Sequence, residues 1–220
     1  MKTMTLSEEN YLKAIFHLAK DKNDGVPTNS IAEEMDTKAS SVTDMLKKLS
    51  EKELVNYKKY QGVQLTEKGR LHALKVIRKH RLWEVFLVEK LNFSWDEVHE
   101  VAEQLEHIQS EKLVAELDAL LGFPKVDPHG DPIPDKNGHL QTTAKVLLSN
   151  LQVGDKGICV GVKNSSKEFL QYLDKLSIAL GNEIEVLSKE PFDHSIQILL
   201  HGQSINLSAM AAGNLYIKKN

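Results

Sequence analysis

A run of ten residues combines imidazole and carboxylate side chains at a spacing that suits one face of a helix. Residues 98–107 read Val-His-Glu-Val-Ala-Glu-Gln-Leu-Glu-His. At about 100° per residue, an α-helix over this run would turn apolar side chains to one side and polar ones to the other. The polar side would carry two histidines and two glutamates: His99, Glu103, Glu106 and His107.

A second stretch, at residues 80–84, repeats this chemistry earlier in the chain. His80 and Glu84 are four residues apart, so a helix would present both on one face. Imidazole binds borderline metal ions, and several carboxylates favour a hard ion of higher coordination number, so the donors suit Mn²⁺, Fe²⁺ or Zn²⁺. The pattern alone leaves an alternative open, in which a solvated helix face carries ordinary histidine–carboxylate ion pairs.

The composition excludes several classes of protein. The chain has 220 residues, of which 41% are hydrophobic, as is ordinary for one or two globular domains. No apolar run approaches the ~20 residues that cross a bilayer, and the N-terminus lacks the apolar core of a signal peptide. We therefore expect a cytoplasmic protein with no membrane partner. The single cysteine, Cys159, lies in an alternating apolar run that predicts a buried free thiol.

The charge is distributed unevenly along the chain. The net charge is −3, yet residues 1–82 contain 16 Lys and Arg against 11 Asp and Glu. The balance is steeper over residues 37–82, with 12 basic residues against 4 acidic ones. A basic first part and an acidic remainder are typical of a protein in which one part meets phosphates and another binds cations.

The first fifty residues have the pattern of a helix-turn-helix. Ser7, followed by two glutamates, is the expected N-cap of a first helix whose apolar run ends near Asp21. Thr28 is a suitable N-cap for a short second helix, and residues 40–51 predict a third with apolar side chains on one face. Two short helices joined by a tight turn form a helix-turn-helix, in which the second helix reads DNA.

The residues that follow predict a wing. Residues 54–66 read as two alternating strands around Gly62. Any single lysine here could simply be a solvated surface residue, but a cluster of lysines behind a helix-turn-helix favours DNA binding. The candidate DNA contacts are Thr28, Lys38, Ser40, Ser41, Thr43, Asp44, Lys47, Lys48, Lys58 and Lys59.

Three further helices are predicted between residues 67 and 121. A long helix begins at Glu67, a second begins at Ser94 or Asp96, and a third covers residues 111–121. Together they carry more apolar surface than a wing domain can cover, so we expect a symmetric homodimer. Three aromatic residues could line the dimer core or pack within the subunit: Trp83, Phe86 and Phe93.

The last hundred residues differ from the first part in composition and in the spacing of apolar residues. Residues 124–138 are rich in proline, glycine and charge, which predicts a solvated linker that includes His129, with His139 just beyond it. Short alternating segments after Leu147 predict a small β-barrel. The fold class is therefore mainly α with a small β part. The expected domains cover residues 1–72 (winged helix-turn-helix), 73–140 (helical dimerisation and metal binding) and 141–220 (barrel).

The order of these parts resembles a known family. Residues 78–84 and 98–107, with the Gly-Asp-Pro-Ile-Pro segment at 130–134, are similar to the diphtheria toxin repressor family of metal-dependent bacterial transcriptional regulators. The resemblance covers the whole chain and implies a C-terminal SH3-like, FeoA-like barrel. It also implies that a divalent metal joins the first helix to the dimerisation helices, so that both recognition helices of the dimer fit the major groove.

The resemblance implies a set of metal ligands. His80, Glu103, Glu106 and His107 match ligand positions, and Glu84 and His99 match an ancillary site. Iron-sensing members resemble one another in having cysteine at position 103, whereas manganese sensors have the glutamate found here. The chain departs from the manganese pattern in its first helix, where Asn10 replaces an aspartate and Lys13 replaces a glutamate. The amide oxygen of Asn10 can still act as a metal ligand, whereas the charge of Lys13 would oppose a cation. In the barrel, Glu168 falls near a further ligand position and Ser165 stands where a carboxylate would be expected.

These observations predict a homodimeric regulator that binds double-stranded operator DNA when Mn²⁺ activates it, and that represses metal-uptake genes without an organic cofactor. Zn²⁺ or another divalent ion could replace Mn²⁺ in vitro. One alternative is an Fe²⁺-dependent repressor of iron-uptake genes, and another is a winged-helix regulator that senses an organic ligand. An enzyme is disfavoured, because di-metal carboxylate oxidases need Glu-x-x-His on two helices, and that pattern is missing here.

Overall fold

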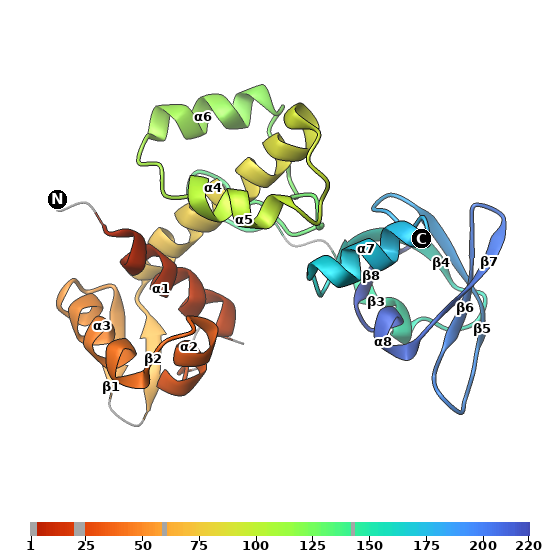
Figure 1. The fold of residues 1–220 in the computed structure, drawn as a ribbon, viewed down its shortest axis with the longest axis horizontal. Helices are drawn as coiled ribbons and strands as arrows, with labels where there is room; N and C mark the ends of the chain where they lie inside the picture. The colour runs from red at the N-terminus through yellow and green to blue at the C-terminus, as the bar shows by residue number, and fades with distance from the viewer. Residues whose placement is uncertain (1–3, 20–24, 59–60, 142–143) are drawn as a thin grey trace. The chain divides into compact units, whose positions relative to one another are not determined.

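The computed structural model describes residues 4–19, 25–58, 61–141 and 144–220. The chain divides into two compact units that interleave along the sequence. Figure 1 labels the helices and strands in chain order. The first unit is Met1–His80, Glu103–Val114 and Pro134–Leu140, and the second is Arg81–Ala102, Ala115–Ile133 and Gln141–Asn220. The candidate DNA contact Lys59 lies outside the described residues.

The first unit begins with three short helices. They are α1 (Leu6–Leu18), α2 (Thr28–Glu34) and α3 (Ala39–Glu51). The cap of α1 is Thr5 rather than the expected Ser7, because the Thr5 hydroxyl and the Glu8 carboxylate bond each other's backbone N–H groups in a capping box. Thr28 is the first residue of α2 and not its cap. The predicted helix-turn-helix is confirmed.

The wing is a two-stranded antiparallel hairpin. Strands β1 (Val55–Lys58) and β2 (Gly62–Leu65) pair from Val55 opposite Leu65 to Lys58 opposite Gly62. Val26 forms an antiparallel β-bridge with Val63, so backbone hydrogen bonds connect the segment before α2 to the wing. The helices and the wing share one apolar core, whose fully buried members include Leu12, Ile15, Ile31, Leu46 and Leu49.

Three helices follow the wing: α4 (Glu67–Leu91), α5 (Val98–Leu105) and α6 (Glu111–Leu120). Helix α4 contributes residues to both units. Helix α5 begins four residues after Ser94 and ends at Leu105, so the expectation of one helix through residue 107 was wrong. Glu106 and His107 lie in the turn after α5.

The segment expected to be a solvated linker is partly buried. Asp127 and His129 are each 5% exposed, and Ile133 is 7% exposed. A bridge between Val126 and Pro132 closes this turn, and the His129 carbonyl accepts a hydrogen bond from the Val162 N–H. The prediction of a solvated His129 was therefore wrong, because the turn packs inside the second unit.

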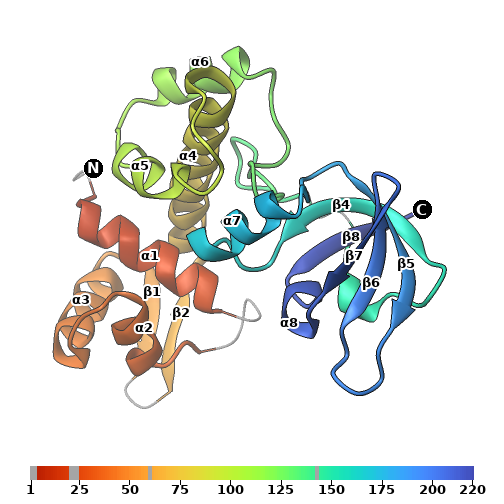
Figure 2. The same ribbon diagram turned by 45° about the vertical axis from the view of Figure 1, so that its right-hand side comes forward.

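The second unit ends in a six-stranded antiparallel sheet in the order β3-β8-β4-β5-β6-β7. Figure 2 shows the curved sheet with helices α7 and α8 beside it. Its apolar core includes Leu170 and Leu173 of α7, so the small β part is a folded domain and the predicted fold class is confirmed. Its elements are β3 (Val146–Leu147), η1 (Leu148–Asn150), β4 (Lys156–Val162), α7 (Lys167–Lys175), β5 (Glu183–Lys189), β6 (Ile196–Leu200), β7 (Gln203–Leu207), α8 (Ala209–Ala212) and β8 (Leu215–Lys219).

The single cysteine belongs to this core. Cys159 is 1% exposed, and burial raises the pKa of its thiol to about 11. The thiol is therefore protonated at neutral pH and has the predicted structural role. In the described part of the chain, we find no helix whose length and apolar character would let it cross a bilayer.

Candidate metal centre and DNA-binding face

The first unit brings a lysine of α1 between one glutamate of α5 and a second glutamate in the turn that follows α5. The Lys13 ammonium lies 2.5 Å from Glu103 Oε1 and 2.7 Å from Glu106 Oε1. The Glu106 carboxylate is fully buried. The two glutamates thus meet at a point that can hold a cation, and the carboxylate convergence predicted from helical spacing is present although α5 ends before Glu106.

Glu106 also meets the first predicted histidine. His80 Nδ1 lies 2.7 Å from Glu106 Oε2, on the carboxylate oxygen opposite the one that faces Lys13. Burial by itself would raise the pKa of Glu106, but the His80 hydrogen bond and the Lys13 charge outweigh burial and lower it. Glu106 is therefore ionised at neutral pH and can act as an anionic metal ligand.

The second predicted histidine is oriented by a residue that the sequence analysis did not single out. Glu9 Oε2 lies 2.6 Å from His107 Nδ1, and this contact directs His107 Nε2 to within 3.6 Å of Glu106. Gln109 donates a hydrogen bond to Glu9 Oε1, and the Lys79 ammonium lies 3.8 Å from the same oxygen. A carboxylate on one ring nitrogen is a common way to aim the other nitrogen at a metal.

One buried oxygen of α1 has no partner among the described residues. It is the amide oxygen of Asn10, which is inaccessible to solvent and accepts no hydrogen bond within this part of the chain. A buried acceptor without a donor costs about 1–3 kcal/mol, so such a group calls for an explanation. An amide oxygen is a suitable ligand for a hard divalent ion. The residues of the first unit therefore fit a metal site of oxygen and imidazole donors.

The second unit contains another group of buried ligand-type side chains. Ligand atoms of Glu84, Asp127 and His129 all lie within 4.8 Å of one another, and all three residues are buried. His99 Nδ1 lies 3.6 Å from Glu84 Oε1 on a side chain that is 61% exposed. His129 Nε2 is 2.8 Å from the Trp95 carbonyl, which leaves Nδ1 directed to Glu84 at 3.7 Å.

The charged groups of this second set shift one another's pKa values, because they are buried close together. Burial, together with the carboxylates of Glu84 and Asp131, raises the pKa of Asp127 to about 6. Burial by itself would lower the pKa of His129, but its ion pair with Glu84 and the charge of Asp127 raise it to about 8. At neutral pH a protonated His129 therefore neutralises part of the group, and a metal ion would have to displace that proton.

The structure thus divides the predicted metal ligands into two sets. Asn10, His80, Glu103, Glu106 and His107 belong to the first unit, and Glu84, His99 and Glu168 belong to the second. Glu168 is exposed in the first turn of α7. Asp127 and His129 were not predicted as ligands from the sequence, although the Asp-Pro-His-Gly run at 127–130 places two ligand types two residues apart in a turn.

The candidate DNA contacts are mostly exposed. In α3, Ser40, Ser41 and Asp44 face solvent, and Lys47 pairs with Asp44 at 3.3 Å on the surface. Thr43 is half-buried, with its hydroxyl on the Ala39 carbonyl. Thr28 is half-buried as well. The remaining described candidates are exposed: Lys38, Lys48 and Lys58.

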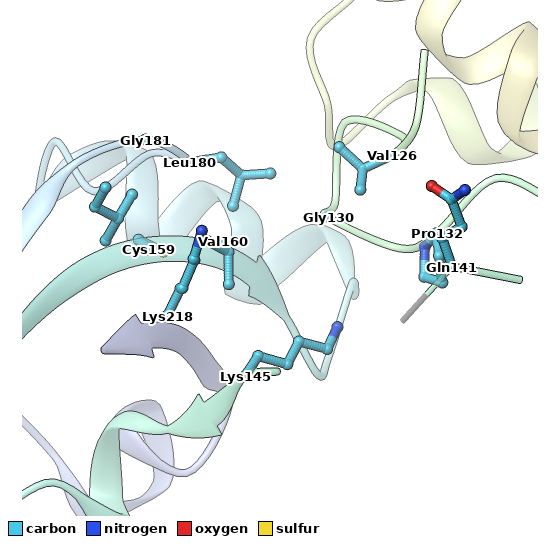
Figure 3. Close-up of a pocket in the computed structure, with 11 residues that line it drawn as sticks. Val126, Gly130, Pro132, Gln141, Lys145, Cys159, Val160, Leu180, Gly181 and Lys218 are labelled. Carbon is cyan, nitrogen blue, oxygen red and sulfur yellow. The ribbon is translucent and has the colours of Figure 1, made fainter. Parts of the chain in front are cut away.

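A cavity of about 360 Å³ lies in the second unit where the 127–133 turn approaches the sheet. Figure 3 shows Gly130 and Pro132 of the turn on one side and Val160 of β4 on the other. Lys145 and Lys218 extend along its edge. The approach of the turn to β4 leaves little room for a side chain at Gly130, whose φ is +85°.

Three family models match successive parts of the chain. Residues 3–63 match the iron dependent repressor, N-terminal DNA binding domain. Residues 66–135 match the iron dependent repressor, metal binding and dimerisation domain. Residues 146–219 match the FeoA domain. The order of these matches is the order of the winged helix, the helical region and the six-stranded sheet.

Individual relatives agree with these matches. An uncharacterised HTH-type transcriptional regulator of Methanocaldococcus jannaschii is 39% identical over 114 residues, which are 52% of this chain and 91% of that protein. The iron-dependent repressor IdeR of Mycobacterium tuberculosis is 35% identical over 136 residues, 61% of this chain and 58% of IdeR.

A solved structure resembles the whole chain. A manganese-dependent transcriptional repressor in complex with manganese is 36% identical, with a TM-score of 0.88 over 97% of this chain and all of that one. Proteins of this kind are DNA-binding repressors and not enzymes. The winged helix-turn-helix, the metal-binding and dimerisation region and the FeoA domain together show that the chain belongs to the diphtheria toxin repressor family of metal-dependent transcriptional repressors.

Proposed function

We propose that this protein is a Mn²⁺-activated repressor of metal-uptake genes. The observation that carries the proposal is the meeting of Glu103 and Glu106 in a unit that also buries the amide oxygen of Asn10, which has no partner among the described residues. Hard oxygen donors in this number favour Mn²⁺ through coordination number and geometry, since Mn²⁺ stands lowest in intrinsic affinity among the first-row divalent ions. The likeness to a manganese-dependent repressor supports the same choice.

Two groups of residues are proposed as metal ligands. The first consists of Asn10, His80, Glu103, Glu106 and His107. The second consists of Glu84, His99, Asp127 and His129, with Glu168 as a further predicted ligand. A bound divalent ion would supply two positive charges that neutralise these carboxylates, and the residues themselves would hold α1 to the segment after α5.

The proposed partner is double-stranded operator DNA, bound by a homodimer. The exposed start of α3 would reach base edges, and the lysines of α3 and the wing would contact phosphates. Apolar side chains around α6 remain exposed in the single chain, which supports a dimer surface there. They include Leu113, Leu120 and Phe123. Trp83 and Phe93 pack within the subunit against Leu87 and Val98.

Metal dependence of DNA binding tests the proposal. Fluorescence anisotropy of a labelled operator fragment would be measured with Mn²⁺, with Fe²⁺ under anaerobic conditions, with Zn²⁺ and with excess chelator. We expect tight binding with Mn²⁺ and a loss of about 5- to 150-fold with chelator, because the coupling free energy between two ligand sites on one protein is typically about 1–3 kcal/mol. Equal affinity with and without chelator would contradict the proposal and favour a metal-independent winged-helix regulator.

Iron is the second candidate metal. The similarity to the iron-dependent repressor IdeR supports it, as does the pair of His99 and Glu84 in the second unit. Imidazole is a ligand that suits Fe²⁺, whereas carboxylate and carbonyl oxygens suit Mn²⁺. Stronger activation by Fe²⁺ than by Mn²⁺ in the same binding assay would replace the manganese proposal with this one.

The lysines of α3 and the wing should determine the salt dependence of binding. Neutral glutamine variants of Lys47, Lys48 and Lys58 are expected to reduce the slope of log K against log salt by about 0.9 for each phosphate that the variant no longer neutralises. The slope would be measured by titrating the operator at several salt concentrations. Lys175→Gln is the control, because Lys175 is an exposed lysine at the end of α7. An unchanged slope in all three variants would place the DNA interface elsewhere.

A further inference from the structure

Lys13 has an unusual environment for a lysine. Its side chain is 14% exposed, and its ammonium contacts Glu103 at 2.5 Å and the fully buried Glu106 at 2.7 Å. By contrast, the surface pair of Lys47 and Asp44 has side chains that are 62% and 71% exposed. Surface pairs contribute little to stability, whereas removal of one partner from a buried pair leaves an uncompensated charge. The Lys13 contacts are therefore energetically important.

The ammonium stands between two carboxylates that are also proposed metal ligands. Lys13 is on α1, and Glu103 and Glu106 are 90 and 93 residues further along the chain. The single positive charge therefore joins the first helix to the end of α5. A divalent ion held by the same two carboxylates would make the same connection, and two cations cannot share this position because like charges at such distances repel strongly.

We propose that Lys13 is a tethered counter-ion of the metal site. In the metal-free protein its ammonium occupies the cation position between Glu103 and Glu106, and a divalent ion binds these carboxylates only by displacing it. Lys13 thereby raises the metal concentration at which the site fills, and it holds the unfilled site together. This inference rests on the proposed metal-binding function and adds to it the residue that sets the threshold.

Two opposite effects of a neutral side chain at position 13 follow. Lys13→Met removes the competitor, so manganese should bind about tenfold to a hundredfold more tightly, as expected when a charged hydrogen bond is removed from the competing state. The same variant leaves Glu106 with a weaker counter-charge, so the metal-free protein should melt at a lower temperature. If Lys13 had only a structural role, Lys13→Met would lower the melting temperature without tightening metal binding.

Calorimetric titration of the chelator-treated full chain with MnCl₂ measures the first effect, and differential scanning calorimetry measures the second. The binding event that disappears in Glu106→Gln identifies the site in question. Lys13→Arg keeps the charge and should bind manganese much as the parent does. Lys52→Met is the matched control, because Lys52 makes a similar 2.5 Å contact with Glu8 of α1 but does not touch the candidate ligands. It should leave the manganese affinity unchanged.

The outcomes separate this inference from the proposed function. If the parent chain binds no manganese, the proposed function itself is overturned. If the parent binds manganese and Lys13→Met binds it no more tightly, only the role of Lys13 is overturned. Tighter binding in Lys13→Met together with unchanged binding in Lys52→Met supports the inference.

A measurement on the parent chain covers the case in which Lys13→Met does not fold. Acetylation of lysines by N-hydroxysuccinimidyl acetate, followed by mass spectrometry, reports how accessible each ammonium is. The reactivity of Lys13 relative to the exposed Lys47 should rise several-fold when manganese is added to the parent, and it should not rise in Glu106→Gln. Unchanged or lower Lys13 reactivity in the manganese-bound parent would show that the ammonium is not displaced.

Discussion

Glu106→Gln is expected to abolish metal-activated operator binding. The substitution preserves the size of the side chain but removes its negative charge, and glutamine cannot serve as an anionic ligand. Glu106 is fully buried and meets His80, Lys13 and His107. Loss of an outer partner of a metal ligand already costs 10–100-fold in affinity, so we expect manganese binding to weaken by at least about a hundredfold.

Calorimetric titration with MnCl₂ and anisotropy with an operator fragment would measure these two losses in parallel. Glu111→Gln is the control, since the Glu111 side chain is 99% exposed and pairs only loosely with Lys75 at 3.9 Å. It should behave as the parent. If Glu106→Gln retained manganese-activated DNA binding, the first group of proposed ligands would be wrong, and the group around Glu84 would become the candidate for activation.

Gly130→Ala is expected to be the most destabilising single substitution in the second unit that we consider. Gly130 has φ of +85°, and a Cβ there would lie 2.0 Å from the Val160 carbonyl oxygen and 2.4 Å from Gly161 Cα. The left-handed conformation costs a non-glycine residue about 1–2 kcal/mol, and overpacking adds about 1–3 kcal/mol. We therefore expect a loss of about 2–5 kcal/mol in the free energy of unfolding of this unit.

Gly154→Ala separates the two causes. Gly154 has φ of +86°, and nothing lies within 4 Å of a Cβ built on it. It should therefore lose only the conformational cost of about 1–2 kcal/mol. Denaturant titration followed by tryptophan fluorescence would compare the two variants, since Trp95 stacks on His129 in the same unit. An equal loss of unfolding free energy in both variants would show that a Cβ at position 130 does not clash with β4.

The Gly130 substitution should also affect the second group of candidate ligands. Asp127 and His129 precede Gly130 in the same turn. The Asp127 carboxylate accepts hydrogen bonds from the backbone N–H groups of His129 and Asp131. A turn displaced from β4 would break the hydrogen bond between the His129 carbonyl and Val162, and the His129 ring would no longer be held in position. We expect Gly130→Ala to bind less metal per subunit than Gly154→Ala.

The local pattern of the sequence determined most of the secondary structure. The apolar spacing of residues 40–51 predicts α3 to within one residue, because a helix that packs on one side needs that period. The wing follows from alternation and from Gly62, which adopts φ of +84° as the first residue of β2. These features depend on neighbours in the sequence, so the sequence is sufficient to predict them.

The sequence also determined the kind of chemistry but not the details of the site. Glu103, Glu106 and His107 were predicted from an uninterrupted helix, yet α5 ends at Leu105. The prediction of their convergence survived because residues this close in sequence remain close in either backbone conformation. Helix ends depend on capping and on the packing of the next turn, so they are harder to predict than the helix itself.

Only the tertiary structure decided the partners of these residues. Lys13 reaches Glu106 across 93 residues, and Glu9 reaches His107 across 98. Asp127 and His129 are buried beside Glu84 although their segment is rich in proline, glycine and charge, a composition that predicts solvent exposure. Contacts over such separations arise from the packing of helices and turns, and no local spacing encodes them. The sequence determined that the chain carries side chains of the types that bind metals, and the packing decided which lysine, glutamate and histidine stand beside each one.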